Sequence, residues 1–368
     1  MTTQRLNRLV NLLKSNGLDA LALNPGQTMT YLSGLNFHIM ERPSVLIVSA
    51  DGKCALVLAE LEKIKLNSAS IPLQGFTYSD NPATWSAAFQ QAFEYLYLND
   101  AKIGVEPTHL RVLELRFLED AAPDANFVSA ENVITELRIQ KEPGEIALMR
   151  KAVEIAQDAF QATVPVIHPG VTEREIGSEL NIQLLRHGSD AEFPFAPIVA
   201  GGPNSSNPHA ALSDRKLIPG DLLVIDWGAS YQGYMSDLTR TIAIGKIDPE
   251  FEKIAGIVLE ANSVGRNASR PGIPTGQVDQ AAREVISHAG YGPQFTHRVG
   301  HGIGMEGHEP PYIFGENQLL LKPGMCHTIE PGIYLAGRGG VRIEDDVVVT
   351  ETGSESLSNL PRQLLFID

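Results

Sequence analysis

The stretch "DLLVIDWGASYQGYMSDLTRTIAIG", residues 221–245, contains two apolar runs separated by a Gln-Gly pair at 232–233. Two apolar runs flanking such a pair are typical of a β-hairpin. Counting outward from this turn, Asp237 lies opposite Gly228 and diagonally across from Asp226, on the same face of the hairpin. Two carboxylates are therefore expected to converge between apolar strands.

A second stretch, "MCHTIEPGIYLAGRGGVRIEDDVVVT" at residues 325–350, predicts a similar hairpin. A turn about Gly337 places Glu330 directly opposite Glu344. Like charges in such positions destabilise a sheet and raise each other's pKa unless a cation compensates them. One or two divalent metal ions would supply that charge, and carboxylates combined with one imidazole suit Mn, Co, Fe or Zn.

The segment "THRVGHGIGMEGHEPP", residues 296–311, also fits the G-x-G-x-x-G pattern of a nucleotide-binding loop between Gly302 and Gly307. Such a loop must lead into a helix, but the proline pair at 310–311 disfavours one. The histidines among these glycines therefore need another explanation. His301, flanked by glycine on both sides, is the natural nitrogen ligand for the expected metal site.

Length and composition limit the class of protein. A chain of 368 residues with 43% hydrophobic and 20% charged residues is typical of a soluble globular protein with two domains. The formal charge of -15 disfavours nucleic acid and anionic membranes as partners. No apolar run reaches membrane-spanning length. Cys54 and Cys326 are expected to be buried free thiols, which favours a cytoplasmic location.

The pattern of helices and strands changes along the chain. Residues 1–131 alternate between the two and predict a small α/β domain. Residues 132–142 are expected to form a linker, and residues 143–368 predict an α+β domain with two pseudo-symmetric αα-ββ halves. The helix pairs of these halves are expected near residues 143–166 and 172–187, and near residues 250–268 and 277–289.

Five of these residues resemble the metal ligands of the pita-bread metallopeptidases, a family that includes methionine aminopeptidase, aminopeptidase P and prolidase. They are Asp226 in "DWG", Asp237 in "SDLTRT", His301 in "GHGIG", Glu330 in "IEPG" and Glu344 in "RIED". The resemblance covers roughly residues 140–368. The preceding domain resembles the creatinase-type N-terminal domain of the proline-specific members.

The resemblance implies a pita-bread fold and a centre with two divalent metal ions, for which Mn²⁺ is favoured over Co²⁺ or Zn²⁺. Asp226 would bind one ion, His301 and Glu330 would bind the other, and Asp237 and Glu344 would bridge them. In the family, water activated by the metals attacks the scissile carbonyl. Glu330 would also transfer the proton of this water.

Three further residues are implied to contact the substrate. His209 in "NPHA" and His308 in "GHEPP" resemble the two non-ligand histidines that stabilise the tetrahedral oxyanion or the leaving group. Arg342 lies two residues before Glu344, so it shares a strand face with that ligand and could orient it or bind a substrate carboxylate. His297 is expected to be a core residue or to lie behind the ligands.

The implied activity is hydrolysis of Xaa-Pro peptide bonds, with proline-containing di- or oligopeptides as substrates. The short chain favours prolidase, and aminopeptidase P acting on longer peptides is the alternative. A metal-free creatinase-like hydrolase or a non-catalytic binding module would be expected to have lost ligands, yet all five are present. A homodimer formed through the N-terminal domain is also expected.

Overall fold

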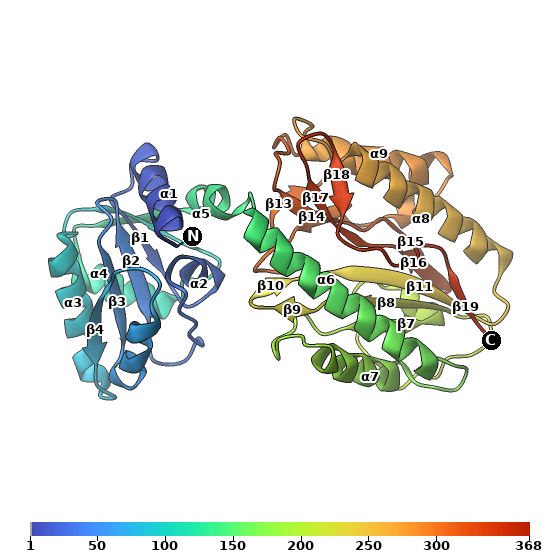
Figure 1. The fold of residues 1–368 in the computed structure, drawn as a ribbon, viewed down its shortest axis with the longest axis horizontal. Helices are drawn as coiled ribbons and strands as arrows, with labels where there is room; N and C mark the ends of the chain where they lie inside the picture. Colours follow the sequence, from blue (N-terminus) through green and yellow to red (C-terminus); the bar gives the residue numbers. More distant parts are fainter. Residues whose placement is uncertain (1) are drawn as a thin grey trace. The chain divides into compact units, whose positions relative to one another are not determined.

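The computed structural model describes residues 2–368, which divide into two compact units. The first unit extends to Arg138 and the second comprises Ile139–Asp368 (Figure 1). Helix α5 (Glu131–Arg138) ends the first unit. The stretch in which the sequence predicts a linker is therefore helical over most of its length.

The first unit is a six-stranded sheet with the order β4-β3-β2-β1-β5-β6 and with helices packed on it. Strand β1 pairs in parallel with β5 and antiparallel with β2. Aromatic and aliphatic side chains of α3 fill the core beside the apolar strands. The strands are β1 (Ala20–Leu23), β2 (Val45–Ser49), β3 (Cys54–Ala59), β4 (Gln74–Tyr78), β5 (Lys102–Val105) and β6 (Asn126–Ser129). The helices before α5 are α1 (Thr2–Ser15), α2 (Gln27–Ser33), α3 (Trp85–Leu96) and α4 (Val112–Ala121).

The first half of the second unit has a helix pair followed by a hairpin. Its elements are α6 (Pro143–Thr163), α7 (Glu173–Arg186), β7 (Ile198–Gly201), β8 (Leu222–Trp227), β9 (Ser230–Tyr231), β10 (Tyr234–Met235) and β11 (Leu238–Ile244). Helix α6 begins with Pro143 in its first turn and a capping box between Glu142 and Glu145. Figure 1 shows α6 and α7 lying along the sheet formed by β7, β8 and β11.

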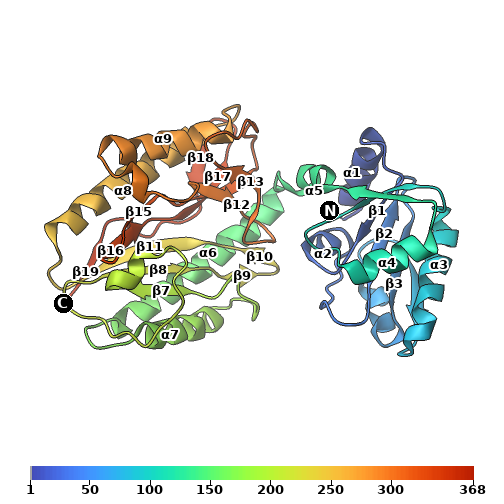
Figure 2. The same ribbon diagram turned by 180° about the vertical axis from the view of Figure 1, so that it is seen from behind.

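The second half repeats this order. Its elements are α8 (Pro249–Ala268), α9 (Thr275–His288), β12 (Gly300–Gly302), β13 (Glu309–Ile313), β14 (Cys326–Ile329), β15 (Gly332–Leu335), β16 (Gly339–Arg342), β17 (Asp345–Val349) and β18 (Ser354–Ser356). The final strand β19 (Leu365–Ile367) returns to the first half and pairs in parallel with β11. In Figure 2 the helix pairs α6/α7 and α8/α9 lie on opposite sides of the strands.

Both hairpins have the predicted register. Thr239 lies opposite Asp226 in the first hairpin, and Asp345 lies opposite Ile329 in the second, so Glu330 and Glu344 face each other. Each hairpin consists of two separate strand pairs, β8/β11 and β9/β10 in the first and β14/β17 and β15/β16 in the second, and the regular ladder is interrupted between them. The carboxylates expected to bind metal lie at or next to these interruptions.

The predicted fold class is confirmed, with an α/β first unit and an α+β second unit containing two αα-ββ halves. The rejection of a nucleotide-binding loop is confirmed as well, because strand β13 follows the glycine-rich segment instead of a helix. Within residues 2–368, no helix is both long and apolar enough to cross a membrane.

Candidate metal centre and active site

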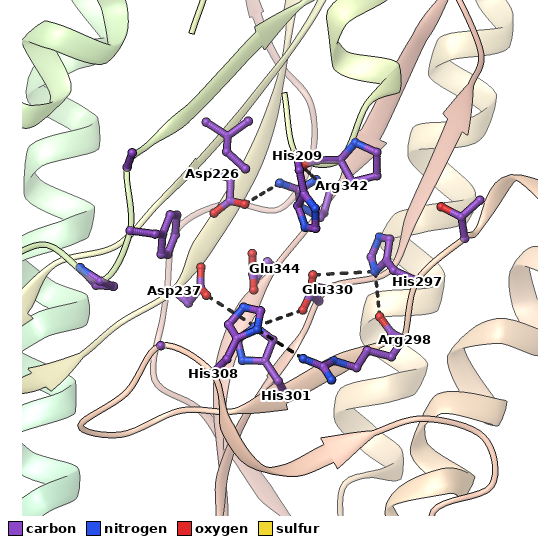
Figure 3. A pocket seen from close by; sticks show the side chains of 17 residues that line it. His209, Asp226, Asp237, His297, Arg298, His301, His308, Glu330, Arg342 and Glu344 are labelled. Atoms are coloured by element: carbon purple, nitrogen blue, oxygen red, sulfur yellow. Dashed lines mark hydrogen bonds and ion pairs between the residues drawn. The ribbon is translucent and has the colours of Figure 1, made fainter. Parts of the chain in front are cut away.

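A pocket of about 780 Å³ opens between the two hairpins of the second unit (Figure 3). Its volume is within the range of about 300–1,000 Å³ that is typical of small-molecule sites. All eight site residues predicted from the sequence line it: His209, Asp226, Asp237, His301, His308, Glu330, Arg342 and Glu344. The pocket therefore brings together residues separated by up to 135 positions in the sequence.

The five expected ligands converge on one wall of this pocket. Ligand atoms of His301, Glu330 and Glu344 lie within 4.8 Å of one another, and so do those of Asp226, Asp237 and Glu344. His301 Nε2 is 3.3 Å from a carboxylate oxygen of Glu330 and 3.7 Å from one of Asp237. Figure 3 shows these side chains pointing toward a common centre.

The four carboxylates repel one another strongly in the absence of a cation. Burial raises the pKa of Asp237 and of Glu344 well above their usual values, and neighbouring carboxylates raise both further. Burial also raises the pKa of Glu330 to about 7. One oxygen each of Asp226 and Asp237 is buried and has no hydrogen-bond partner within the described chain. Such groups are costly unless another ligand satisfies them.

The imidazole of His301 is oriented as a metal ligand. Its Nδ1 lies 3.1 Å from the carbonyl oxygen of Gly302, which can only accept a hydrogen bond. Nδ1 therefore carries the proton, and the lone pair of Nε2 points toward the carboxylates. Burial lowers the pKa of His301 well below its usual value, so the ring is neutral near pH 7. This is the tautomer that binds divalent metal.

The donor set fits two divalent cations. The unpaired buried oxygens and the mutual repulsion both call for positive charge, and four carboxylates with one imidazole provide ligands for it. When bound, two such ions supply Lewis-acid activation of the peptide carbonyl and of water. Asp226, Asp237, His301, Glu330 and Glu344 would hold them.

The glycines beside His301 permit close packing of strands. A Cβ atom on Gly300 would lie 2.0 Å from the carbonyl oxygen of Thr328, and one on Gly302 would lie 2.3 Å from that of Pro310. Both contacts are with backbone atoms of neighbouring strands, so no side chain fits. The glycines thus bring β12 close to its neighbours and place His301 in the pocket wall.

Arg342 is fully engaged by protein groups. It is 3% exposed and donates to Asp226 Oδ2 at 2.6 Å, to Thr239 Oγ1 at 3.1 Å and to Tyr334 OH at 3.0 Å. Thr239 in turn donates to Glu344 at 2.6 Å. These hydrogen bonds orient a carboxylate from each half of the unit.

His308 stacks on the ligand His301 and contacts a cation. The two imidazole centroids are 3.7 Å apart. Arg298 Nη2 lies 3.3 Å from His308 Nδ1, and because the guanidinium can only donate, Nδ1 accepts. Burial and then Arg298 lower the pKa of His308, so the ring is neutral and Nε2 carries a proton. His308 can therefore donate a hydrogen bond into the pocket.

His209 and His297 occupy the wall near Arg342. His209 is exposed on the loop after Pro208, whose carbonyl accepts from Arg342 at 3.4 Å. His297 lies 2.9 Å from Tyr334 OH, and burial lowers its pKa to about 4. His297 Nδ1 is also 3.9 Å from the expected ligand Glu330, so His297 lies behind the ligands, which was one of the two positions expected for it. It lines the pocket as well.

Sequence reasoning did not identify Arg298 as a pocket residue. Its guanidinium lies over the ring of Tyr312, 4.5 Å from the centroid, and forms no ion pair within residues 2–368. The available signal was its position three residues before His301. Because alternate residues of a strand share a face, that spacing alone did not place it on the ligand side.

The chain belongs to metallopeptidase family M24, whose pattern matches residues 147–351. Residues 5–140 match the creatinase/prolidase N-terminal domain. The predicted membership of the pita-bread metallopeptidases is therefore confirmed, and the protein is a metallopeptidase.

Several relatives resemble it over the full length. A Xaa-Pro dipeptidase from Pyrococcus horikoshii is 34% identical over 98% of this chain and 99% of its own. The prolidase structure from Thermococcus sibiricus superposes with a TM-score of 0.94 at 34% identity, covering 100% of this chain and 99% of that one. An X-Pro aminopeptidase from Thermotoga maritima gives a TM-score of 0.86 at 31% identity, covering 98% and 99%.

Proposed function

We propose that this protein hydrolyses peptide bonds that precede proline, using two divalent metal ions, and that its preferred substrates are Xaa-Pro dipeptides. The observation that carries the proposal is the convergence of four carboxylates and one imidazole on the wall of a single pocket. The names of the full-length relatives, Xaa-Pro dipeptidase and prolidase, support the choice of bond.

Each ligand has a proposed place at this centre. Asp226 would hold one ion, His301 and Glu330 would hold the other, and Asp237 and Glu344 would contribute to both. Glu330 also accepts and returns the proton of the attacking water. The side chain of Glu330 is 15% exposed, which gives its carboxylate access to a substrate in the pocket.

The two non-ligand histidines are proposed to be catalytic and substrate-binding residues. His308 carries its proton on Nε2 and can donate to the oxyanion that forms at the scissile carbonyl. His209 lies next to Arg342 in Figure 3 and lines the same pocket, so it would contact the substrate from there. We assign Arg342 to the orientation of Asp226, because its donors already have protein partners.

Arg298 supports a dipeptidase. A free dipeptide presents a carboxylate on its proline, and a guanidinium without a carboxylate partner is suited to bind it. Arg298 lines the pocket and lies next to His308. An enzyme that releases one residue from a longer peptide would instead need an exit at this end of the pocket.

The test compares Leu-Pro, Leu-Pro amide and Leu-Pro-Gly as substrates, with Leu-Leu as a control for proline. We expect Leu-Pro to be cleaved with the highest kcat/KM and Leu-Leu to be cleaved poorly. Replacing Arg298 by Met should raise the KM for Leu-Pro about 10- to 100-fold, since a charge-assisted hydrogen bond contributes about 1.5–3 kcal/mol. The KM for the amide should change little.

Aminopeptidase P activity is the second candidate. It is favoured by the full-length similarity to the X-Pro aminopeptidase from Thermotoga maritima. Cleavage of the amide and the tripeptide as fast as the free dipeptide would select it over the dipeptidase. Failure to cleave any Xaa-Pro peptide would reject both.

The remaining assignments complete the proposal. Mn²⁺ is the proposed metal, since oxygen donors outnumber nitrogen four to one. The two buried free thiols, Cys54 and Cys326, support a reducing cytoplasmic location. We further propose that residues 1–131 and 143–368 are the functional domains, and that the first forms the contacts of a homodimer. A monomeric mass in solution at micromolar concentration would contradict the dimer.

A further inference from the structure

A buried ion pair lies beneath the loop that carries His308, and the proposed chemistry does not use it. Lys141 Nζ is 2.5 Å from Glu309 Oε1, and the two side chains are 2% and 4% exposed. Glu309 directly follows His308, whereas Lys141 lies just after the start of the second unit at Ile139. The pair thus connects two segments that are 168 residues apart.

Glu309 closes the base of the loop formed by residues 303–308. It lies opposite Gly302 where β12 pairs with β13, and its second oxygen accepts from the backbone N–H of Glu306 at 3.3 Å. Glu309 therefore holds the loop at two points, through its place in strand β13 and through the hydrogen bond from Glu306.

The backbone of the loop rests directly on the ion pair. A Cβ atom on Gly304 would lie 2.7 Å from Glu309 Oε1 and 2.8 Å from Lys141 Cε, so a larger residue there would displace the ion pair. The carbonyl of Gly304 accepts from the N–H of Met235, at 2.8 Å, in the first hairpin. A shift of the ion pair would therefore move this part of the loop.

Lys141 is itself fixed to the second unit. Its backbone N–H donates to the carbonyl of Gly324 at 2.8 Å, and the preceding Gln140 forms an isolated bridge with Met325. The ammonium group is therefore presented by an anchored segment of backbone.

Energetic considerations point to orientation as the role of this pair. The free-energy cost of removing two charges from water offsets most of the attraction between them. A buried ion pair is therefore often no more stabilising than apolar side chains of similar size. An ion pair does, however, fix the relative positions of the two backbone segments to which its side chains belong. A backbone that contains glycine is flexible by itself, so side-chain contacts such as this pair help to set the path of the loop that ends at His308.

We infer that Lys141 and Glu309 are positioning residues that set the place of His308 above His301. This inference rests on the proposed function in one respect, because the catalytic role of His308 is assigned there. The pair lines no part of the pocket and includes none of the expected metal ligands. It acts through the loop.

The first test replaces both charges together, as Lys141→Met with Glu309→Met. We expect a melting temperature close to that of the parent protein and an unchanged metal content. The kcat/KM for Leu-Pro should fall about 10- to 100-fold, as is typical when a partner that orients a site residue is removed. Arg150→Met with Glu355→Met is the matched control, because that 2.7 Å ion pair is exposed. The control should retain full activity.

A double-mutant cycle distinguishes positioning from general damage. In a His308→Ala background, the same double replacement should lower kcat/KM less than about threefold, because the residue through which it acts is gone. An equal loss in both backgrounds would overturn the inference, and so would the absence of any loss in the parent background.

A spectroscopic measurement is independent of activity. In the Zn²⁺-loaded protein with ¹⁵N-labelled histidine, the ring signals of His308 should shift or broaden in the double variant, while those of the exposed His168 should not. Unchanged His308 signals would reject the inference even in a protein that cleaves no Xaa-Pro peptide. Inactivity of the parent protein would reject only the proposed function. If the double variant does not fold, Glu309→Gln supports the same measurements.

Discussion

The two hairpins of the second unit share a register but carry different donors. Opposite Asp237 in the first hairpin lies Gly228, whereas opposite Glu344 in the second lies Glu330. The second carboxylate of the first hairpin belongs to Asp226, two residues before Gly228 on the same strand. The same backbone pairing thus produces a diagonal carboxylate pair in one half and a directly opposed pair in the other.

The strands next to the two hairpins, β7 in the first half and β12 in the second, also differ in the donors that they provide. Ile198 of β7 lies opposite Asp226, whereas His301 of β12 donates its backbone N–H to Thr328 at 3.1 Å. An apolar side chain therefore occupies the position at which the second half supplies an imidazole. One side of the centre has only oxygen donors and the other has oxygen and nitrogen. We expect the two metal positions to differ in affinity for this reason.

The largest expected effect is that of metal removal. Because the carboxylates of both halves repel one another without cations, a demetallated protein should be inactive and should melt at a lower temperature. Mn²⁺ or Co²⁺ should restore activity, and titration should show two equivalents per chain with unequal affinities. Full activity after complete removal of metal would refute the centre, and full activity at one equivalent would refute its dinuclear form.

Glu330→Gln should have the next largest effect. The substitution removes the carboxylate that distinguishes the second hairpin from the first, and with it both a ligand charge and the proposed proton carrier. We expect turnover to fall about 10³-fold or more while the far-UV circular dichroism is unchanged. A variant that retains more than a tenth of the parent activity would show that Glu330 has neither role.

The sequence allowed the carboxylate pair of each hairpin to be predicted, because the two-residue period of a strand fixes which side chains share a face, whereas the set of five expected ligands followed from the resemblance to the pita-bread metallopeptidases. The glycine-containing turns at residues 232–233 and 337 then set both registers. Contacts between the two halves could not be derived in this way. The pairing of Arg342 with Asp226 joins residues 116 positions apart, and depends on how the two hairpins pack.

Elements without an apolar pattern could not be predicted from the sequence either. Strand β4 has only one buried residue, Tyr78, so neither alternation nor an apolar run marks it. The place of Arg298 in the pocket depends on the path of the chain into β12, and the ion pair between Lys141 and Glu309 depends on the loop that follows. Such loop geometry arises from tertiary packing and leaves no periodic signal.

The pH dependence of stability tests the opposed carboxylates of the second hairpin. In the metal-free protein the pKa of Glu330 is about 7, compared with an ordinary value of 4.5. The folded state therefore binds the proton more tightly, and stability is greatest below pH 4.5 and is lost as the pH rises toward 7. The loss from this group should be roughly 3 kcal/mol. Thermal melts of metal-free protein across this range measure it.

Two controls accompany these melts. The Glu330→Gln variant should lose the part of the slope that belongs to Glu330, while the part from Asp237 and Glu344, whose pKa values are also raised, should remain. Metal-loaded protein should not lose stability over the same range, since bound cations favour the ionised carboxylates. Metal-free protein whose melting temperature stays constant or rises between pH 5 and 7 would contradict the raised pKa.

The smallest expected effect concerns Gly228, the counterpart of Glu330 in the first hairpin. A Cβ atom there would lie 2.0 Å from the carbonyl oxygen of Ser236, so Gly228→Ala must displace the strand that leads to Asp237. We expect a loss of about 1–3 kcal/mol in the free energy of unfolding and weaker metal binding. Gly256→Ala is the matched control, because Gly256 is exposed in helix α8 and its Cβ would meet no atom within 4 Å. That substitution should stabilise the protein by about 0.5–1 kcal/mol. The free energies of unfolding of the two variants are measured by denaturant melts. A change of the same sign in both would contradict the close approach of Gly228 to Ser236 in the first hairpin.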